Sequence, residues 1–335
     1  MPDLLTIEQK ICGAEPLREA LGDNLASGVL KLQASCHPDR HPDKVQEATA
    51  LYHRISVLAE SIRDPKTISS PKHKYNTAGP FAVGDVSDLY FGWEGDKDFV
   101  LKISRVNGAH LMLEREYTVL SQIQSAAFNL EKEARAEGKR SMMTHYFPVI
   151  VETFPAKDSI QRRVNVFVAS SGYYPLPVVV RRNLGLNVRH IVWIFKRTLL
   201  GLDFAHKLGI VHGAVLPQHI LVSPETHGVM IVGWGHSVDE GSRVRTISKD
   251  FKSWYPPEVL EKKPAYSGTD TYMAAKCMLS ALDGHSPKIE SFLKACMLPG
   301  VNMRLNSGNA FEIWQDFNDL AQELFGRPQW AELTM

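Results

Sequence analysis

The sequence predicts an α+β protein, in which an N-terminal helical hairpin precedes a larger body with a small, mostly β lobe and a large, mostly α lobe. Three observations support this prediction. An apolar stripe at helical spacing lies before residue 65, short β-like runs begin near residue 81, and strongly helical segments follow residue 187. With 335 residues and 44% apolar content, the chain is long enough for about two domains with real cores.

The helical hairpin is predicted for residues 1–65. Between about Val45 and Arg63, apolar residues recur at spacings of three and four, so they fall on one face of a helix. These residues are Ala48, Leu51, Tyr52, Ile55, Leu58, Ala59 and Ile62. The preceding SGVLKLQAS supplies a short partner helix, and the two prolines of CHPDRHPDK prevent one continuous helix. Residues 66–80 are rich in Ser, Pro, Lys and Gly without an apolar period, which predicts a linker.

The body is predicted to begin with a sheet-rich lobe at residues 81–170. The runs FAV, DLYFGW, DFVLKIS, YFPVIVETF and VNVFVAS predict strands, and HLMLEREYTVLSQI predicts a helix among them. The run NVRHIVWIFKRTLLGLDFAH predicts a buried helix. The rest of residues 171–335 is predicted to be mostly helical, except for the hairpin-like ILVSPETHGVMIVGW.

Composition and charge narrow the classes of function. A formal net charge of +1 gives no bulk electrostatic attraction to nucleic acid or to an anionic membrane. No apolar stretch reaches 18 residues and the N-terminus lacks a signal-peptide pattern, so we expect a cytoplasmic protein. The cysteines lie far apart without a CxxC pair, which predicts neither a zinc ribbon nor a disulfide scaffold.

His37, Pro38 and Asp39 form an HPD tripeptide between the two predicted helices. With the YHRISVLAESIRDP helix that follows, it resembles the J domain of DnaJ-type co-chaperones. The resemblance implies that the loop binds a DnaK-type chaperone and accelerates its ATP hydrolysis, through a carboxylate acceptor and an imidazole donor. A second copy at residues 41–43 lies in the loop and receives no separate role. The alternative is a J-like module that binds partners without stimulating a chaperone.

The segment GIVHGAVLPQHILV, residues 209–222, is similar to the catalytic loop of protein kinases, which reads H-R-D-L-K-P-E-N. Ala214 stands at the position of the catalytic Asp, and His219 at that of the metal-binding Asn. In the following MIVGWG, similar to a strand and the D-F-G motif, Gly233 stands at the position of the metal-binding Asp. The resemblance spans residues 77 to about 325. It implies a bilobal kinase fold that lacks its catalytic and metal-binding groups, so we expect no metal site.

The same resemblance implies part of a nucleotide site. Lys102 in FVLKIS matches the Lys that contacts the α and β phosphates of ATP. Glu116 matches the helix Glu that pairs with this Lys, and Glu114 is a close alternative. Two interpretations stay open: the pair helps to bind ATP, with magnesium poorly supported, or it is an ion pair that joins sheet to helix.

The glycine-rich strap of the kinase family is degraded in this chain. Gly84 is the remaining glycine of the segment Gly84–Leu89. Asp85 and Asp88 beneath the phosphates of a nucleotide would repel them. This substitution pattern disfavours ordinary ATP binding.

Residues with an architectural role in the kinase family are matched more completely. Trp254–Glu258, reading WYPPE, resembles the A-P-E end of an activation segment, and Arg304 is the expected partner of Glu258. Asp270 resembles the buried helix Asp that braces the catalytic loop. The framework is therefore predicted to be intact where the chemistry is lost.

These observations predict a catalytically impaired kinase-like scaffold or adaptor with a J-like module, which binds a protein partner through the kinase-like body. One alternative is an atypical active Ser/Thr protein kinase with relocated acids, such as Asp239, Glu240 or Asp250. Another is a co-chaperone that recruits clients to a DnaK-type ATPase.

Overall fold

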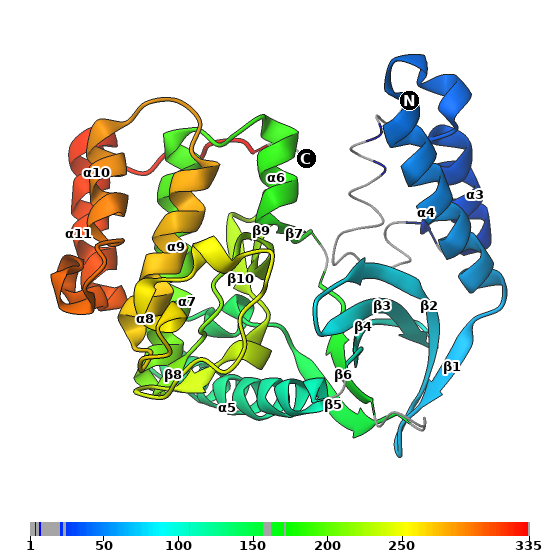
Figure 1. Ribbon diagram of the computed structural model, residues 1–335, viewed down its shortest axis with the longest axis horizontal. Coiled ribbons are helices and arrows are strands. Elements are labelled where there is room, and N and C mark those ends of the chain that lie inside the picture. Colours follow the sequence, from blue (N-terminus) through cyan, green and yellow to red (C-terminus); the bar gives the residue numbers. More distant parts are fainter. Residues whose placement is uncertain are drawn as a thin grey trace. The chain divides into compact units, whose positions relative to one another are not determined.

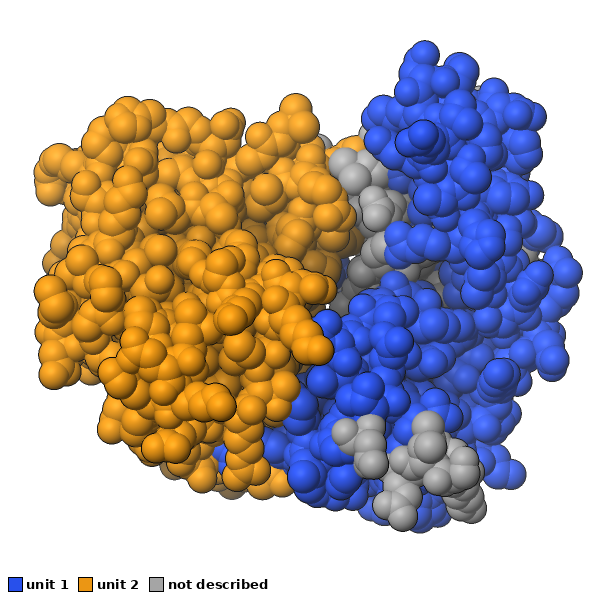
Figure 2. Space-filling view, in the orientation of Figure 1, with its two compact units in different colours: residues 1–117, 149–173 blue, residues 118–148, 174–335 orange. Residues whose placement is uncertain are grey.

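The computed structural model describes residues 4, 7, 21–22, 25–106, 108–156, 162–170 and 172–333. The chain forms two compact units, residues 1–117 with 149–173 and residues 118–148 with 174–335 (Figure 2). Helix α5 (Ala109–Ala136) contributes to both units. The predicted domain ranges 1–65, 81–170 and 171–335 divide the chain more finely and stay a prediction, whereas residues 66–80 do not form the predicted linker.

The first unit begins with a pair of helices, α3 (Leu25–Ser35) and α4 (Val45–Arg63) (Figure 1). The loop between them contains two short 3₁₀ turns, η1 (Pro38–Arg40) and η2 (Pro42–Lys44), each beginning with a proline. The predicted helical hairpin is thus confirmed for these residues. Most of the helical prediction for residues 1–24 lies outside the described residues.

A six-stranded antiparallel sheet follows, with the order β1-β2-β3-β4-β6-β5. Its strands are β1 (Lys66–Ser69), β2 (Lys74–Val83), β3 (Ser87–Glu94), β4 (Lys97–Ser104), β5 (Ile150–Pro155) and β6 (Arg163–Val168). The β-like runs predicted from residue 81 onward all contribute to this sheet, and α5 contains the helix predicted among them. The sheet-rich lobe is therefore confirmed.

The predicted linker differs from the structure, because residues 66–80 are mostly strand. β1 and β2 pair around a turn in which the Ser70 hydroxyl accepts hydrogen bonds from the Lys72 and His73 amides. Tyr75 is fully buried, and its hydroxyl donates to Glu152 Oε1 at 2.7 Å. A strand that buries only some of its side chains needs no continuous apolar run. The polar composition of β2 therefore resembled that of a linker in the sequence.

Helix α4 packs against the sheet through one apolar cluster. The buried members on α4 are Ala48, Leu51, Ile55, Leu58 and Ala59. They share the cluster with Ala78 of β2 and Phe91 of β3, and the rings of Phe81 and Phe91 lie 4.3 Å apart. The predicted apolar stripe is confirmed, and its partners include the sheet as well as α3. The helices and the sheet consequently share one core.

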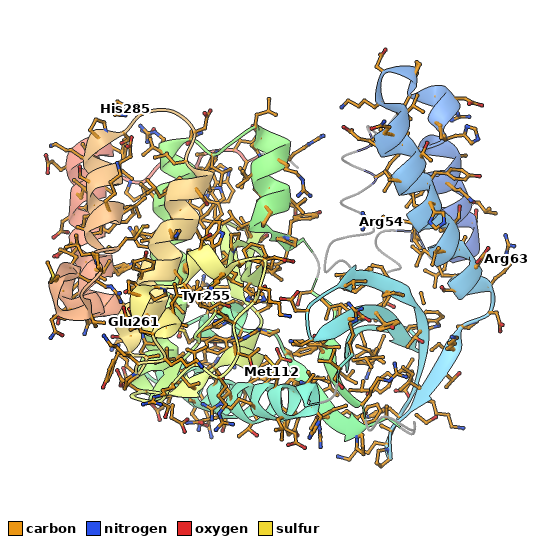
Figure 3. The ribbon with its side chains drawn as sticks, in the orientation of Figure 1. Arg54, Arg63, Met112, Tyr255, Glu261 and His285 are labelled. Carbon is orange, nitrogen blue, oxygen red and sulfur yellow. The ribbon has the colours of Figure 1, made fainter. Side chains whose placement is uncertain are left out.

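The second unit is mostly helical and contains a short hairpin. Its principal helices are α6 (Leu176–Asn183), α7 (Val188–Lys207), α8 (Pro257–Leu260), α9 (Ser267–Ala281), α10 (Pro287–Ala295) and α11 (Ala310–Phe325). The predicted hairpin is confirmed by β9 (Ile220–Ser223) and β10 (Gly228–Ile231), which pair antiparallel. Side chains fill the space between the helices, and Tyr255, labelled in Figure 3, is 2% exposed.

Two further properties concern the described residues as a set. No helix among them is both long and apolar enough to cross a bilayer. Cys36, Cys277 and Cys296 are free thiols in buried positions. Burial raises the pKa of the Cys296 thiol to about 12, so this group stays protonated near neutral pH.

Candidate functional site

The segment that resembles a catalytic loop is held by one buried carboxylate. Asp270, in the first turn of α9, accepts hydrogen bonds from the backbone amides of His212 at 2.7 Å and Gly213 at 2.8 Å. The His206 ring lies 2.9 Å from the same carboxylate. The expected bracing role of Asp270 is confirmed. A rigid loop at this position fixes the residues that follow it.

The His212 ring connects this loop to the end of β10. Its Nε2 donates to the Val232 carbonyl at 2.9 Å, while its Nδ1 accepts from the Ala214 amide at 3.2 Å. The ring is fully buried and stacks edge-on against Trp234 at 4.6 Å. The loop that contains His212 is thereby placed next to the segment that follows β10.

Ala214, His219 and Gly233 meet where the two segments join. His219 Nδ1 donates to the Ala214 carbonyl at 2.7 Å. Gly233 adopts φ = 88°, and a Cβ placed on it would lie 2.8 Å from three atoms of the His219 ring. The imidazole therefore occupies the space that a side chain at position 233 would enter. Only glycine fits both this backbone conformation and this contact.

These residues do not fit a magnesium ion. Magnesium takes hard oxygen ligands, whereas the position matching the metal-binding Asp has no side chain and its neighbour offers an imidazole. The described residues contain no cluster of three or more His, Cys, Asp or Glu side chains able to hold a metal. Ala214, His219 and Gly233 therefore offer no side-chain oxygen to a magnesium ion at this position.

In the first unit, Lys102 of β4 pairs with Glu116 of α5 at 2.8 Å. Their side chains are 16% and 2% exposed. Asn165 Nδ2 donates to the other carboxylate oxygen of Glu116 at 3.1 Å and to the Leu113 carbonyl at 2.9 Å. The alternative partner, Glu114, forms an ion pair with Arg163 instead. The predicted pairing is therefore the one with Glu116.

The turn between β2 and β3, which matches the strap, is tight. The Gly84 amide donates to the Ser87 carbonyl at 3.0 Å, and a Cβ on Gly84 would lie 2.8 Å from that oxygen. Asp88 lies 3.6 Å from Nε of Arg105, and the Arg105 guanidinium also donates to the Gly84 carbonyl. Arg105 was not predicted, because nothing in its local sequence marks it. Its charge offsets part of the repulsion expected from Asp88.

The HPD turn lies in the loop between α3 and α4, where Pro38 and Asp39 belong to η1. His37 Nδ1 accepts from the Asp39 amide at 3.3 Å, and its ring packs edge-on against Tyr52 at 5.3 Å. Asp39 is 88% exposed. In the second copy of the tripeptide, His41 Nε2 donates to the Ser35 carbonyl at 2.8 Å and thus satisfies the end of α3.

A curled antiparallel sheet with a Lys–Glu pair, followed by a helical unit with a braced loop, defines a protein kinase-like fold. The solved structure of vaccinia related kinase 3 matches 78% of this chain and 91% of its own length, with a TM-score of 0.59 and 17% identity. That likeness concerns the fold alone. No protein family model matches the chain.

Curated relatives also carry kinase names. Casein kinase II subunit alpha' of Saccharomyces cerevisiae is 28% identical over 96 residues, covering 28% of this chain and 27% of that protein. Serine/threonine-protein kinase MST20 of Pyricularia oryzae is 26% identical over 133 residues, covering 38% of this chain and 14% of that protein. The chain thus spans about a quarter or less of the length of these two relatives.

Proposed function

We propose that this chain is a protein kinase-like scaffold that binds a partner protein and does not transfer phosphate. The observation that supports the proposal is the position of the His219 ring, which occupies the space that a side chain on Gly233 would enter. Ala214 at the position of the catalytic base adds a loss of about 10²–10⁴-fold in rate. The buried framework around Asp270 is retained. A retained framework without reactive groups fits a binding role.

A nucleotide is the candidate ligand of the first unit. The ammonium group of Lys102 is held by Glu116, and Arg105 adds a second cation near the Gly84 turn. These groups could contact the phosphates of ATP without a metal, whereas a purely structural Lys–Glu pair would bind none. A thermal-shift titration with ATP, with and without magnesium, separates the two: binding raises the melting temperature with the logarithm of ATP concentration.

We expect no magnesium-dependent phosphorylation of the chain itself or of generic protein substrates. The rate should equal the background without protein, and Lys102→Ala should leave it unchanged. Incorporation of radioactive phosphate from labelled ATP measures both. Robust autophosphorylation that disappears in Lys102→Ala would overturn the proposal and favour the atypical active Ser/Thr kinase, with Asp239, Glu240 or Asp250 as the relocated acid.

A second candidate function, a co-chaperone activity, rests on the HPD turn. His37 and Asp39 are 44% and 88% exposed, and Pro38 fixes the backbone between them. Such a turn offers a carboxylate and an imidazole to a basic partner surface. The proposed partner is a DnaK-type chaperone in the cytoplasm, to which the kinase-like body would bring a client protein.

The HPD turn can be tested by the ATP turnover of a DnaK-type chaperone. We expect the wild-type chain to accelerate steady-state turnover and His37→Gln to abolish the acceleration. Asp43→Asn, in the exposed second copy of the tripeptide, is the matched control and should behave as wild type. If the chaperone turns over ATP at the same rate with wild type and with His37→Gln, the HPD turn does not stimulate it. The proposal of a kinase-like scaffold would be unaffected by this result.

A further inference from the structure

The segment that follows α11, residues 328–333, lies on the second unit without forming a helix or strand. No backbone-to-backbone hydrogen bond joins it to another described residue. His190 of α7 and His227 of the turn between β9 and β10 contact it through their side chains. A segment held in this way resembles a bound peptide more than an integral element of a fold.

Three aromatic rings form a stack at the centre of this contact. The His227 ring lies between Trp193 and Trp330, with ring centroids 4.3 Å and 3.7 Å away. The interplanar angles are 5° and 4°, so all three rings are nearly parallel. Trp330 nevertheless remains 65% exposed. The indole is thus held by one face only, as a ligand side chain would be.

Two histidine side chains lie against the backbone of the segment. His227 Nε2 donates to the Ala331 carbonyl at 2.8 Å. His190 lies close to the Glu332 backbone, and its Nδ1 accepts from Trp193 Nε1 at 3.3 Å. Because the indole donates to Nδ1, the proton of the neutral imidazole must be on Nε2, which faces the segment. Leu333 ends the contact in a buried position.

We propose that His190, Trp193 and His227 form a binding site for an extended Trp-x-x-Leu peptide, here called the tail site, which residues 330–333 occupy in cis. The stack recognises the indole, the His227 imidazole recognises the carbonyl that follows it, and the buried leucine sets the spacing. A partner protein that carries an exposed Trp-x-x-Leu segment would bind the tail site after the cis segment leaves. The backbone next to Gly326, which has φ = 69°, is the place where the segment can turn away.

The test uses the full chain and a fluorescent peptide of residues 326–333. Trp330→Ala weakens the binding of residues 330–333 to the tail site of the same chain. In wild type, this tethered segment competes with the added peptide at a high effective concentration. We therefore expect the variant to bind the peptide at least about tenfold more tightly than wild type. A peptide with Ala in place of its Trp is the control and should not bind. Fluorescence anisotropy measures the affinities. Equal binding to the variant and to wild type, or equal binding of both peptides, would overturn the proposal.

His227→Asn tests the receptor side of the contact. His227 has φ = 50°, a conformation that Asn tolerates, so this change removes the ring without straining the turn. Added to Trp330→Ala, it should abolish peptide binding. In the otherwise wild-type chain, it should speed chymotrypsin cleavage after Trp330, followed as loss of residues 331–335 by mass spectrometry. Unchanged cleavage and unchanged binding would each contradict the role of the stack.

Discussion

Gly233→Asp is expected to destabilise the protein by roughly 2–6 kcal/mol and to leave it unable to phosphorylate substrates. The backbone at this position has φ = 88°, which costs a non-glycine residue roughly 1–3 kcal/mol. The new Cβ would also lie 2.8 Å from the His219 ring, and overpacking of this kind costs roughly another 1–3 kcal/mol. Urea unfolding followed by circular dichroism measures the loss.

A double-mutant cycle identifies the ring as the cause. In a His219→Asn background, the shorter side chain leaves room at position 233, so the same Gly233→Asp change should cost less by about 0.5–3 kcal/mol. The remaining cost is that of the positive φ. Strictly additive effects, within about 0.5 kcal/mol, would show that His219 does not obstruct the position. Neither single variant supplies a complete magnesium site, so both should stay inactive.

The sequence predicts the framework well, because framework residues act through short local patterns. The run around α7 shows helical spacing, and the segment 209–222 keeps enough kinase-like positions to be aligned. From that alignment the position of Ala214 followed directly, and Asp270 was predicted from the separate segment SGTDTYMAAK. The hydrogen bonds of Asp270 to two loop amides then agree with its expected role. Local patterns survive in this chain even where the reactive groups are lost.

Contacts between distant segments could not be predicted in the same way. Tyr75 of β2 is buried, and its hydroxyl donates to the carboxylate of Glu152. Nothing in the sequence around either residue indicates that they are partners. The stack of Trp193, His227 and Trp330 joins three segments that share no motif. The obstruction of Gly233 by His219 also requires three-dimensional geometry. What the sequence lacks is therefore the pairing of elements rather than their existence.

Glu258→Gln is expected to destabilise the second unit by about 3–5 kcal/mol, since it leaves a buried cation without its counter-charge. Arg304 Nη1 and Nη2 donate to the two carboxylate oxygens of Glu258 at 2.8 and 2.7 Å, and the guanidinium is fully buried. The predicted partnership is confirmed in this bidentate form. Glu323→Gln is the matched control. Its pair with Lys288 is more than half exposed, and exposed pairs contribute about 1 kcal/mol or less.

The pH dependence of this penalty distinguishes loss of charge from loss of shape. Burial would raise the pKa of the Glu258 carboxyl, but hydrogen bonds and the positive charge of Arg304 outweigh it and hold the pKa below 4.5. The ionised carboxylate therefore stabilises the fold above pH 4.5, and this contribution is lost as the pH falls through the lower value in the folded state. Wild type and Glu258→Gln should accordingly converge in unfolding free energy on acidification. A difference that stays constant with pH would instead assign the penalty to altered packing, because Gln has nearly the same shape but no charge to titrate.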